Sequence, residues 1–405
     1  MGCKSIIKKS RCRTKGKVIN PLGKKLENVE WEKFELNDLF EKVKVKSLKY
    51  KASELPNNPT GEFILPALTA GIENQGLNNY VPKNNATILK NVISISANGA
   101  NTGATFYQNK EFTVLQDSYA IKWKYTDDSL TDNHYLYLTA SISNTIFGNF
   151  EWTNKAGWER IKSERIYLPT KNGKINFDFM EYFIAELEQE RINELKAYLK
   201  ASGLEDYNLT DEEQKALDEF DSMKWKEFRL GDLFEKIKTN KLPFKASELQ
   251  KEPTDTYNLP CLTSSFQNQG LNYYAPKDNA TILKNVISIP SNSDVYRAYF
   301  QSREFTVLSD AYAIEWIYND VKLSPNQYLF TVPCINKVTN LSIYSYKNKL
   351  GGWNVVQNKN IALPIKNNQP DYETMEILIS AIKKLVIKDV VLYANEKLIQ
   401  QKSGE

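Results

Sequence analysis

The chain contains one long segment twice, and this duplication constrains its fold more than any other feature. Residues 74–95 read NQGLNNYVPKNNATILKNVISI and residues 268–289 read NQGLNYYAPKDNATILKNVISI, with 19 of 22 positions identical at an offset of 194 residues. The same offset aligns the pattern W-x-x-F-x-L-x-D-L-F, which begins at Trp31 and again at Trp225. Solenoid repeats are far shorter, roughly 20–50 residues. The sequence therefore predicts two copies of a globular domain.

Length and composition are those of an ordinary multidomain protein. The 405 residues suffice for about two or three domains, and the 41% apolar content can fill two separate cores. No apolar run approaches the roughly 20 residues that cross a bilayer, and the N-terminus lacks the apolar stretch of a secretory signal. We therefore expect a soluble, cytoplasmic protein without a membrane partner.

Charge is distributed unevenly along the chain. The overall net charge is +4, but residues 1–30 carry nine Lys/Arg against two Glu, and residues 177–222 carry four Lys/Arg against fourteen Asp/Glu. The rest of the chain, which comprises the two repeats and the C-terminal segment, carries a net charge of about +7, mostly on the second repeat. Such a balance helps to hold a polyanion, although it falls short of the strongly basic surface of a stand-alone DNA-binding domain.

Catalytic and metal-binding patterns are missing from the sequence. The only histidine, His134, lies beside two tyrosines and is expected to be structural. No C-x-x-C spacing, phosphate-binding glycine loop, G-x-S-x-G elbow or Pro-Pro segment occurs. We expect no catalytic residue, no metal and no cofactor in this chain, with free thiols at Cys3, Cys12, Cys261 and Cys334. The pattern favours a binding protein.

The two repeats divide the chain into five segments. Strand-like runs at 86–95, 112–115 and 119–123 and short helical turns at 36–40 and 230–234 predict an α/β (α+β) domain in each copy. Asn74–Asn78 and its copy are expected to be structural, with Gly76 and Gly270 in turns. The predicted segments are a basic leader (1–30), a first domain (31–174), central helices (175–222), a second domain (223–367) and a C-terminal helix (368–405). The leader is expected to be solvated, with an auxiliary phosphate contact as the alternative.

Each domain is followed by a long amphipathic helix. One is predicted from Phe177 to Lys200 and the other from Asp371, and a short helix over 211–220 has a capping box at Thr210 and Glu213. The long helices most simply bury their stripes against each other as an antiparallel coiled coil. Twenty-four residues span about 36 Å, close to the roughly 34–36 Å of one DNA turn. The residues predicted to pack between the helices are Phe183, Leu187, Leu195, Leu378, Ile382 and Leu385.

This layout resembles the DNA-specificity subunits of type I restriction-modification systems. The likeness rests on the order domain, helix, domain, helix, on the W-x-x-F-x-L-x-D-L-F starts, on the stretch 98–121 and on the Gly-Trp and Leu-Pro pairs that close each domain. It covers nearly everything from Trp31 onward. BcgI-like type II relatives share the layout, so the type of system stays open.

The resemblance implies a non-catalytic subunit that binds double-stranded DNA. Each domain would read one half of a split, asymmetric target, and the helices would set the gap and dock two copies of a methyltransferase subunit. A restriction/translocase subunit would join in type I systems. S-adenosylmethionine would be bound by the methyltransferase partner.

A comparison of the two repeats locates the candidate DNA contacts. Residues shared by both copies, such as Asn74–Asn78, are expected to hold the fold or to contact the backbone common to any DNA. Divergent loops between matched strands are expected to read bases. Asn pairs with adenine and Arg with guanine in the major groove, and lysines near the Gly-Trp pairs suit phosphate. The candidates are Asn98, Asn101 and Thr102, with Lys155 and Arg160, in the first copy, and Asn292, Ser293, Tyr296, Arg297, Tyr346, Lys347 and Lys349 in the second.

Two other functions remain open at this point, as does a donor copy of a specificity subunit whose methyltransferase partner is absent. A duplicated carbohydrate- or ligand-binding protein would use the abundant Tyr and Trp as stacking surfaces, but it leaves the two long apolar helices without a role. An enzyme active between the domains has no supporting cluster of residues.

Overall fold

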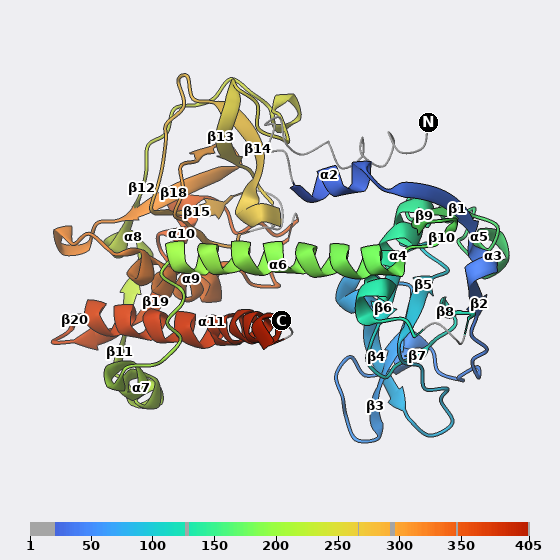
Figure 1. Ribbon diagram of the computed structural model, residues 1–405. Coiled ribbons are helices and arrows are strands. Elements are labelled where there is room, and N and C mark those ends of the chain that lie inside the picture. Colours follow the sequence, from blue (N-terminus) through green and yellow to red (C-terminus); the bar gives the residue numbers. More distant parts are fainter. Residues whose placement is uncertain (1–20, 126–128, 266, 292–295, 346, 404–405) are drawn as a thin grey trace. The chain divides into compact units, whose positions relative to one another are not determined.

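The computed structural model describes residues 21–125, 129–265, 267–291, 296–345 and 347–403 (Figure 1). The chain divides into two compact units, and the boundary between Glu194 and Leu195 falls inside a long helix. Each unit is a mixed α/β domain, which confirms the predicted duplication and fold class.

Both domains contain the same three small sheets. In the first domain the strand orders are β1-β9-β10, β2-β8-β5-β6 and β4-β3-β7, and in the second they are β11-β19-β20, β12-β18-β15-β16 and β14-β13-β17. All pairings are antiparallel except β3 with β7 and β13 with β17. The strands of the first domain are β1 (Glu30–Glu35), β2 (Phe40–Lys42), β3 (Phe63–Leu68), β4 (Leu77–Pro82), β5 (Val92–Ser96), β6 (Thr105–Gln108), β7 (Thr113–Val114), β8 (Ser118–Trp123), β9 (Arg165–Lys171) and β10 (Lys174–Ile175). Those of the second are β11 (Trp225–Arg229), β12 (Phe234–Lys236), β13 (Tyr257–Leu262), β14 (Leu271–Pro276), β15 (Val286–Pro290), β16 (Tyr299–Gln301), β17 (Thr306–Val307), β18 (Ala311–Trp316), β19 (Asn360–Lys366) and β20 (Gln369–Pro370).

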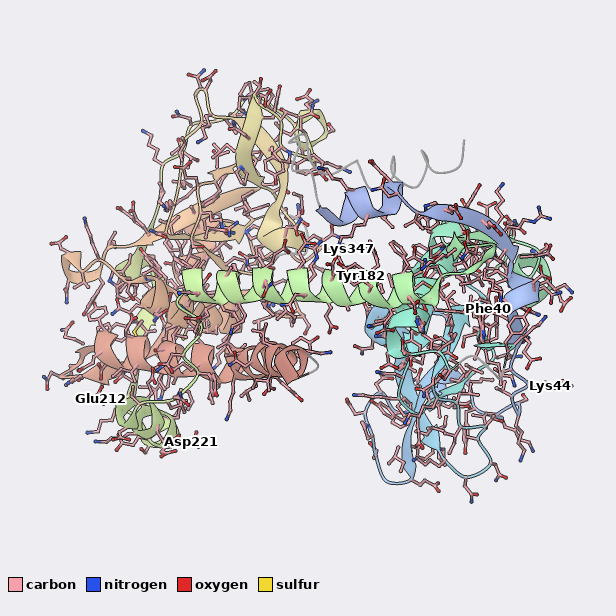
Figure 2. All side chains as sticks on the ribbon, in the orientation of Figure 1. Phe40, Lys44, Tyr182, Glu212, Asp221 and Lys347 are labelled. Carbon is pink, nitrogen blue, oxygen red and sulfur yellow. The ribbon has the colours of Figure 1, made fainter. Side chains whose placement is uncertain are left out.

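The repeated sequence pattern at each domain start forms a short helix that enters the core. These helices are α3 (Leu36–Leu39) and α8 (Leu230–Leu233), as predicted. Phe40, labelled in Figure 2, and its copy Phe234 follow them, and each packs edge to face on a tryptophan of the neighbouring strand. Both phenylalanines are buried, so the shared pattern serves the fold.

The repeated Asn-Gln-Gly segment forms a strained turn in both copies. Asn74, Gln75 and Gly76 have φ of 45°, 56° and 82°, and the copy has φ of 46°, 56° and 86°. Left-handed backbone at non-glycine residues costs on the order of 1–3 kcal/mol each. The side-chain amide of Gln108 donates to the Gln75 carbonyl at 3.3 Å, and Gln301 does the same for Gln269. The surrounding sheet therefore holds this turn, as expected of a structural segment.

A fifteen-residue helix in each domain escaped the sequence prediction. These helices are α4 (Asp132–Ile146) and α9 (Pro325–Thr339). Both begin with a capping box: Thr131 accepts from the backbone of His134, and Ser324 accepts from that of Gln327. The Thr/Ser cap three residues before His or Gln was therefore the available signal. Strand-forming residues surround these caps, so the change from the period of a strand to that of a helix was not recognised.

His134 is structural, as predicted. Its Nδ1 accepts from the Thr131 N–H at 3.1 Å, and its Nε2 lies 3.1 Å from the Phe177 carbonyl. Gln327 occupies the same position in the second domain. Its Oε1 accepts from the Ser324 N–H, and its Nε2 donates to the Tyr372 carbonyl. An amide has fixed donor and acceptor ends, so this equivalence assigns the proton of a neutral His134 to Nε2.

A glutamate from the long helix binds the start of α4 and α9, and we call this contact the clasp. In the first domain, Glu181 accepts hydrogen bonds from the Thr131 hydroxyl and, at 2.6 Å, from the Asn133 amide. Glu181 lies on α6 (Phe177–Ala201). The second domain repeats the clasp with Ser324, Asn326 and Glu376, the last on α11 (Tyr372–Ser403).

The first turns of α6 and α11 belong to the domain cores. Met180 and Met375 are fully buried there. Phe183 packs on Tyr137 of α4 with ring centroids 5.9 Å apart, and Leu378 is buried in the core of the second domain. The prediction that Leu378 packs between the two long helices is therefore corrected, because its own domain covers it. Phe183 is half-buried, and its packing against the other long helix stays a prediction. Both helices otherwise match the predicted ranges.

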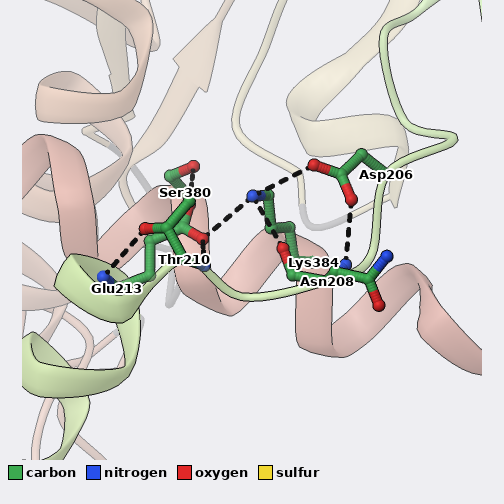
Figure 3. A network of polar contacts seen from close by, with 6 residues as sticks. All are labelled: Asp206, Asn208, Thr210, Glu213, Ser380 and Lys384. Atoms are coloured by element: carbon green, nitrogen blue, oxygen red, sulfur yellow. Dashed lines mark hydrogen bonds and ion pairs between the residues drawn. The ribbon is translucent and has the colours of Figure 1, made fainter.

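A polar network joins the acidic segment after α6 to α11 (Figure 3). The short helix α7 (Asp211–Asp218) begins with the predicted capping box of Thr210 and Glu213. The buried Glu213 carboxylate accepts from Ser380 at 2.6 Å and from Lys384 at 2.9 Å. Burial raises the pKa of Glu213, but these hydrogen bonds outweigh burial and leave the pKa below its usual value. Glu212 and Asp221, labelled in Figure 2, are exposed.

The end of the predicted leader is folded. Residues Pro21–Glu27 form α2, whose Lys25 binds Tyr182 and Glu186 of α6. The Trp31 indole donates to the Leu26 carbonyl at 3.2 Å. Part of the predicted leader is thus helical and in contact with α6, and residues 1–20 lie outside the described part of the chain.

We predict that Lys384→Met lowers the free energy of unfolding of the second domain by about 1–3 kcal/mol, because Glu213 loses a charged donor while it stays buried. Lys388→Met, an exposed lysine of the same helix, is the control and should change little. Chemical denaturation measures both. Because the folded-state pKa of Glu213 is depressed, the pair stabilises at neutral pH, and the deficit should shrink as the pH falls below about 4.3. A deficit that is independent of pH would contradict this account.

Candidate nucleic-acid interface

A basic cleft lies at one end of the first domain. Its volume is about 460 Å³, and its walls come from β2, from the end of β5, from the loop after α4 and from the short helix α5 (Trp158–Ile161). Lys42, Lys155 and Arg160 line it together with Ala97 and Thr153. The structure thus brings the two predicted phosphate contacts, Lys155 and Arg160, to one cleft beside the predicted base-reading loop. Lys42 joins them and was not predicted.

The cations of this cleft are exposed, and neighbouring side chains contact them. Arg160 donates to the Asn154 side chain at 3.1 Å, and the ammonium of Lys42 lies 5.3 Å from the ring centre of Tyr119. Glu159 also lines the cleft, but its carboxylate is paired with Lys162. Three exposed cations around one cavity can bind a phosphate group as charge-assisted donors.

Two loops of the first domain are joined beneath the cleft. The Thr102 hydroxyl accepts from the Ala156 N–H at 2.9 Å, and the Tyr119 hydroxyl donates to the Ala156 carbonyl at 2.9 Å. Thr102 is only 2% exposed, and burial raises the pKa of Tyr119. The prediction of Thr102 as a DNA contact is therefore corrected, because its hydroxyl is used inside the protein.

The other two candidates of this loop lie nearer the surface. Asn98 is half-buried, and its amide donates to Asp117 at 2.8 Å. The Ala97 N–H donates to the Asp117 carbonyl at 2.9 Å. Asn101 is also half-buried. Asp117 therefore fixes the start of the loop, and a base contact by Asn98 or Asn101 stays a prediction.

The second domain holds its corresponding loop differently. Tyr296 is 1% exposed, and its ring packs 5.8 Å from that of Tyr344. Its prediction as a DNA contact is corrected, because it belongs to the core. Arg297, the next residue, is exposed above the Tyr299 ring at 5.7 Å. Lys347, labelled in Figure 2, and Lys349 are exposed. Asn292, Ser293 and Tyr346 lie outside the described residues.

Sequence reasoning missed an apolar residue at the tip of each divergent loop. The Trp152 side chain is 68% exposed, and Lys155 lies 5.7 Å from its ring centre. Ile343 holds the comparable place after α9 and is 61% exposed. The prediction concentrated on hydrogen-bonding side chains and overlooked these two. Apolar side chains can contact a thymine methyl group.

The remaining packing candidates lie outside the domain cores. Ile382 and Leu385 are about half exposed, and with Val386 and Val390 they form an apolar stripe along α11. Leu187 and Leu195 of α6 are half-buried. Inside the second unit, Leu199 lines a small cavity with Val391 and Ala394. Pairing of the two long helices as a coiled coil stays a prediction.

The described part of the chain contains no group of three or more His, Cys, Asp or Glu side chains placed to hold a metal ion. Cys261 and Cys334 are free thiols, and burial raises the pKa of Cys334 to about 11. Among the described helices, none combines the length and apolar character needed to cross a membrane.

Comparison with known proteins finds the same repeated domain. The family model of the type I restriction modification DNA specificity domain matches residues 28–197 and again residues 223–392. The chain is 22% identical over 369 residues to the specificity subunit S.BcgI of a type II restriction enzyme from Heyndrickxia coagulans, which covers 89% of this chain and 96% of the relative.

A solved structure shares the fold. The S subunit of a type I restriction-modification system from M. genitalium superposes with a TM-score of 0.54 at 15% identity, covering 93% of this chain and 94% of that chain. At this identity the likeness supports the architecture alone.

We predict that Arg160→Ala weakens binding to random DNA duplexes about equally for every sequence. The slope of log K against log salt concentration should become shallower by about one, because one phosphate contact is lost. Titrations of the full chain at several salt concentrations measure it. Arg191→Ala, an exposed arginine already paired with Glu194, should leave the slope unchanged. An unchanged slope for Arg160→Ala would remove this residue from the interface.

We predict that Arg297→Ala relaxes the sequence preference at one position of one half-site. The physical reason is the loss of a bidentate contact worth about 1–3 kcal/mol. Selection from random duplexes measures the preference. Arg303→Ala is the matched control, because Arg303 is exposed and lies at the other end of β16. Equal weakening for all sequences would make Arg297 a phosphate contact.

Proposed function

From the finding that this chain belongs to the type I restriction modification DNA specificity family, we propose that it reads a split, asymmetric DNA sequence, with one half-site per domain. The family gives the DNA-specificity role. The split target, the division of labour between the domains and the partners are our proposal.

The observation that carries the proposal is the contrast between shared scaffold and divergent loops. Both domains have the same strand orders, the same clasp and the same strained turn. They differ where exposed side chains gather: Arg160 of the first domain corresponds to Val355 in the second, and Arg297 corresponds to no arginine in the first. Two domains with the same fold and different exposed side chains suit two half-sites whose base sequences are related but different.

The spacing of the half-sites would be set by the long helices. The helix α6 has 25 residues, about 37 Å at 1.5 Å per residue. One turn of B-DNA is about 34–36 Å. Since the clasp fixes α6 to the first domain through Glu181, a change in helix length moves everything that follows it.

The chemistry would reside on partner subunits. We propose that this chain is non-catalytic and positions two methyltransferase subunits and, in a type I system, a restriction/translocase subunit. Adenine methylation with S-adenosylmethionine would occur on the methyltransferase. The exposed stripe of Ile382, Leu385, Val386 and Val390 on α11 supports a role in assembly, because apolar surface of this kind marks protein contacts. The specificity role is common to type I systems and to S.BcgI, so the proposal does not depend on the type.

The experiment that tests this function is deletion of the gene in its host, followed by single-molecule sequencing of N6-methyladenine. Loss of one split, gapped motif is the expected result, and it identifies both half-sites together. Complementation with the wild-type gene should restore the motif. A methylation pattern unchanged by deletion would contradict the proposal.

We predict that four residues inserted into α6 after Glu190 lengthen the gap of the motif by about two base pairs, since they add about 6 Å. Both half-sites should be unchanged. The same four residues inserted at the exposed Asn58 serve as the control and should leave the gap unchanged. Sequencing of methylated sites gives the gap directly. A fixed gap in the α6 variant would exclude the helix as the spacer.

A further inference from the structure

The second domain contains a polar pocket outside the regions considered so far. Its volume is about 540 Å³, and it lies between the segment after β12 and the loop that joins β13 to β14. Hydroxyl, amide, ammonium and carboxylate groups line it together. The lining includes Lys251, Ser264, Ser265, Gln267, Asn272 and Asp310.

The matching residues of the first domain are in close contact with one another. Asn57 and Gly71 stand at the positions of Lys251 and Ser265. The Asn79 amide is buried and donates to Asn57 at 3.2 Å and to the Ala52 carbonyl at 3.1 Å. The Asn78 amide covers Gly71 so closely that an added Cβ would lie 2.9 Å from its nitrogen.

The open pocket follows from substitutions at these positions. A serine at 265 requires the asparagine at the position of Asn78 to shift its side chain, because a Cβ would otherwise lie 2.9 Å from the amide nitrogen. In the second domain Ser265 and Asn272, the equivalent of Asn78, both line the pocket. Tyr273 replaces the buried Asn79, so the hydrogen bonds that close the first domain are lost here.

The pocket adjoins the loop that carries Arg297. Asp310 lines the pocket, and its carbonyl accepts from the Ser291 N–H at 2.9 Å, where that loop begins. At the other end of the loop, Gln301 of β16 donates to the Gln269 carbonyl in the strained turn beside the pocket. Hydrogen bonds therefore connect the pocket region to residues on either side of the loop that carries Arg297.

We propose that this pocket takes the edge of a base pair and sets one or two positions of the half-site read by the second domain. The inference rests on the proposed function. A base edge in the major groove presents donors and acceptors that amides, hydroxyls, a lysine and a carboxylate can match. Ser265 is already oriented, because its Oγ accepts from the Gln267 N–H at 3.2 Å.

The pocket also accounts for asymmetry between the half-sites. In the first domain the corresponding loop presents Ala70, Gly71 and the half-exposed Ile72. At the positions of Ser264 and Ser265, the first domain therefore has no side chain that can form a hydrogen bond. A contact made by these two positions would distinguish the half-site of the second domain from that of the first.

The test replaces pocket residues with those of the first domain. Lys251→Asn with Ser265→Gly introduces residues that the same scaffold already carries in the other copy, so the fold should be kept. Lys284→Asn is the control, because this exposed lysine precedes β15 while the loop of Arg297 follows it. Each variant replaces the wild-type gene in the host, and methylated motifs are determined by single-molecule sequencing.

The expected result is a motif that becomes degenerate at one or two positions of one half-site, with discrimination lowered about tenfold or more. The other half-site, the gap and methylation at the original sites should be kept, and Lys284→Asn should match the wild type. An unchanged motif in the double variant would overturn the proposed role of the pocket but would not contradict the proposed function. A uniform loss at all sites would also overturn it, because it indicates phosphate binding or damage to the fold. Absence of any split motif in the wild type would overturn both proposals.

Discussion

The clasp is the contact on which the rest of the structure depends. In each domain one glutamate of the long helix takes donors from the first turn of the helix beneath it, Glu181 from Thr131 and Asn133, and Glu376 from Ser324 and Asn326. A buried methionine one residue before each glutamate, Met180 or Met375, anchors the same turn in the core. Direction and register of the long helix are thereby fixed to the domain. Under the proposed function, this connection gives the two half-sites a defined spacing.

A scaffold held so firmly allows its loops to differ. The strained Asn-Gln-Gly turn is the same in both copies, and the same glutamine amide holds it. On this common frame the first domain builds a basic cleft from Lys42, Lys155 and Arg160, and the second builds a polar pocket around Lys251 and Ser265. The two domains therefore present different chemistry through one architecture. This difference supports the proposed asymmetric target.

Much of this architecture could be predicted from sequence because it is periodic or repeated. The duplication, the helices α6 and α11 and the cap at Thr210 all follow from local patterns. The helices α4 and α9 were missed because their caps stand among strand-forming residues. The predicted DNA contacts of Thr102 and Tyr296 were wrong for another reason. Divergence between the copies locates a loop, but it does not indicate which side chains of the loop are buried. Lys155 and Arg160 meet in one cleft because residues just before and after a Gly-Trp pair curl around the start of α5. The pocket was invisible because it depends on how Asn78 and Asn272 are placed.

The measurement that tests the central claim most directly is the target of a chain whose second domain has been exchanged for the first. Residues 230–364 would be replaced by residues 36–169. In the natural chain, Ser324 and Asn326 bind Glu376, and Gln327 binds the Tyr372 carbonyl. In the exchanged chain, Thr131, Asn133 and His134 would take these places. The account predicts a methylated motif in which the first half-site occurs on both sides of the gap, in a symmetric arrangement. Retention of the natural second half-site in this chain would contradict the claim that each domain reads its own half.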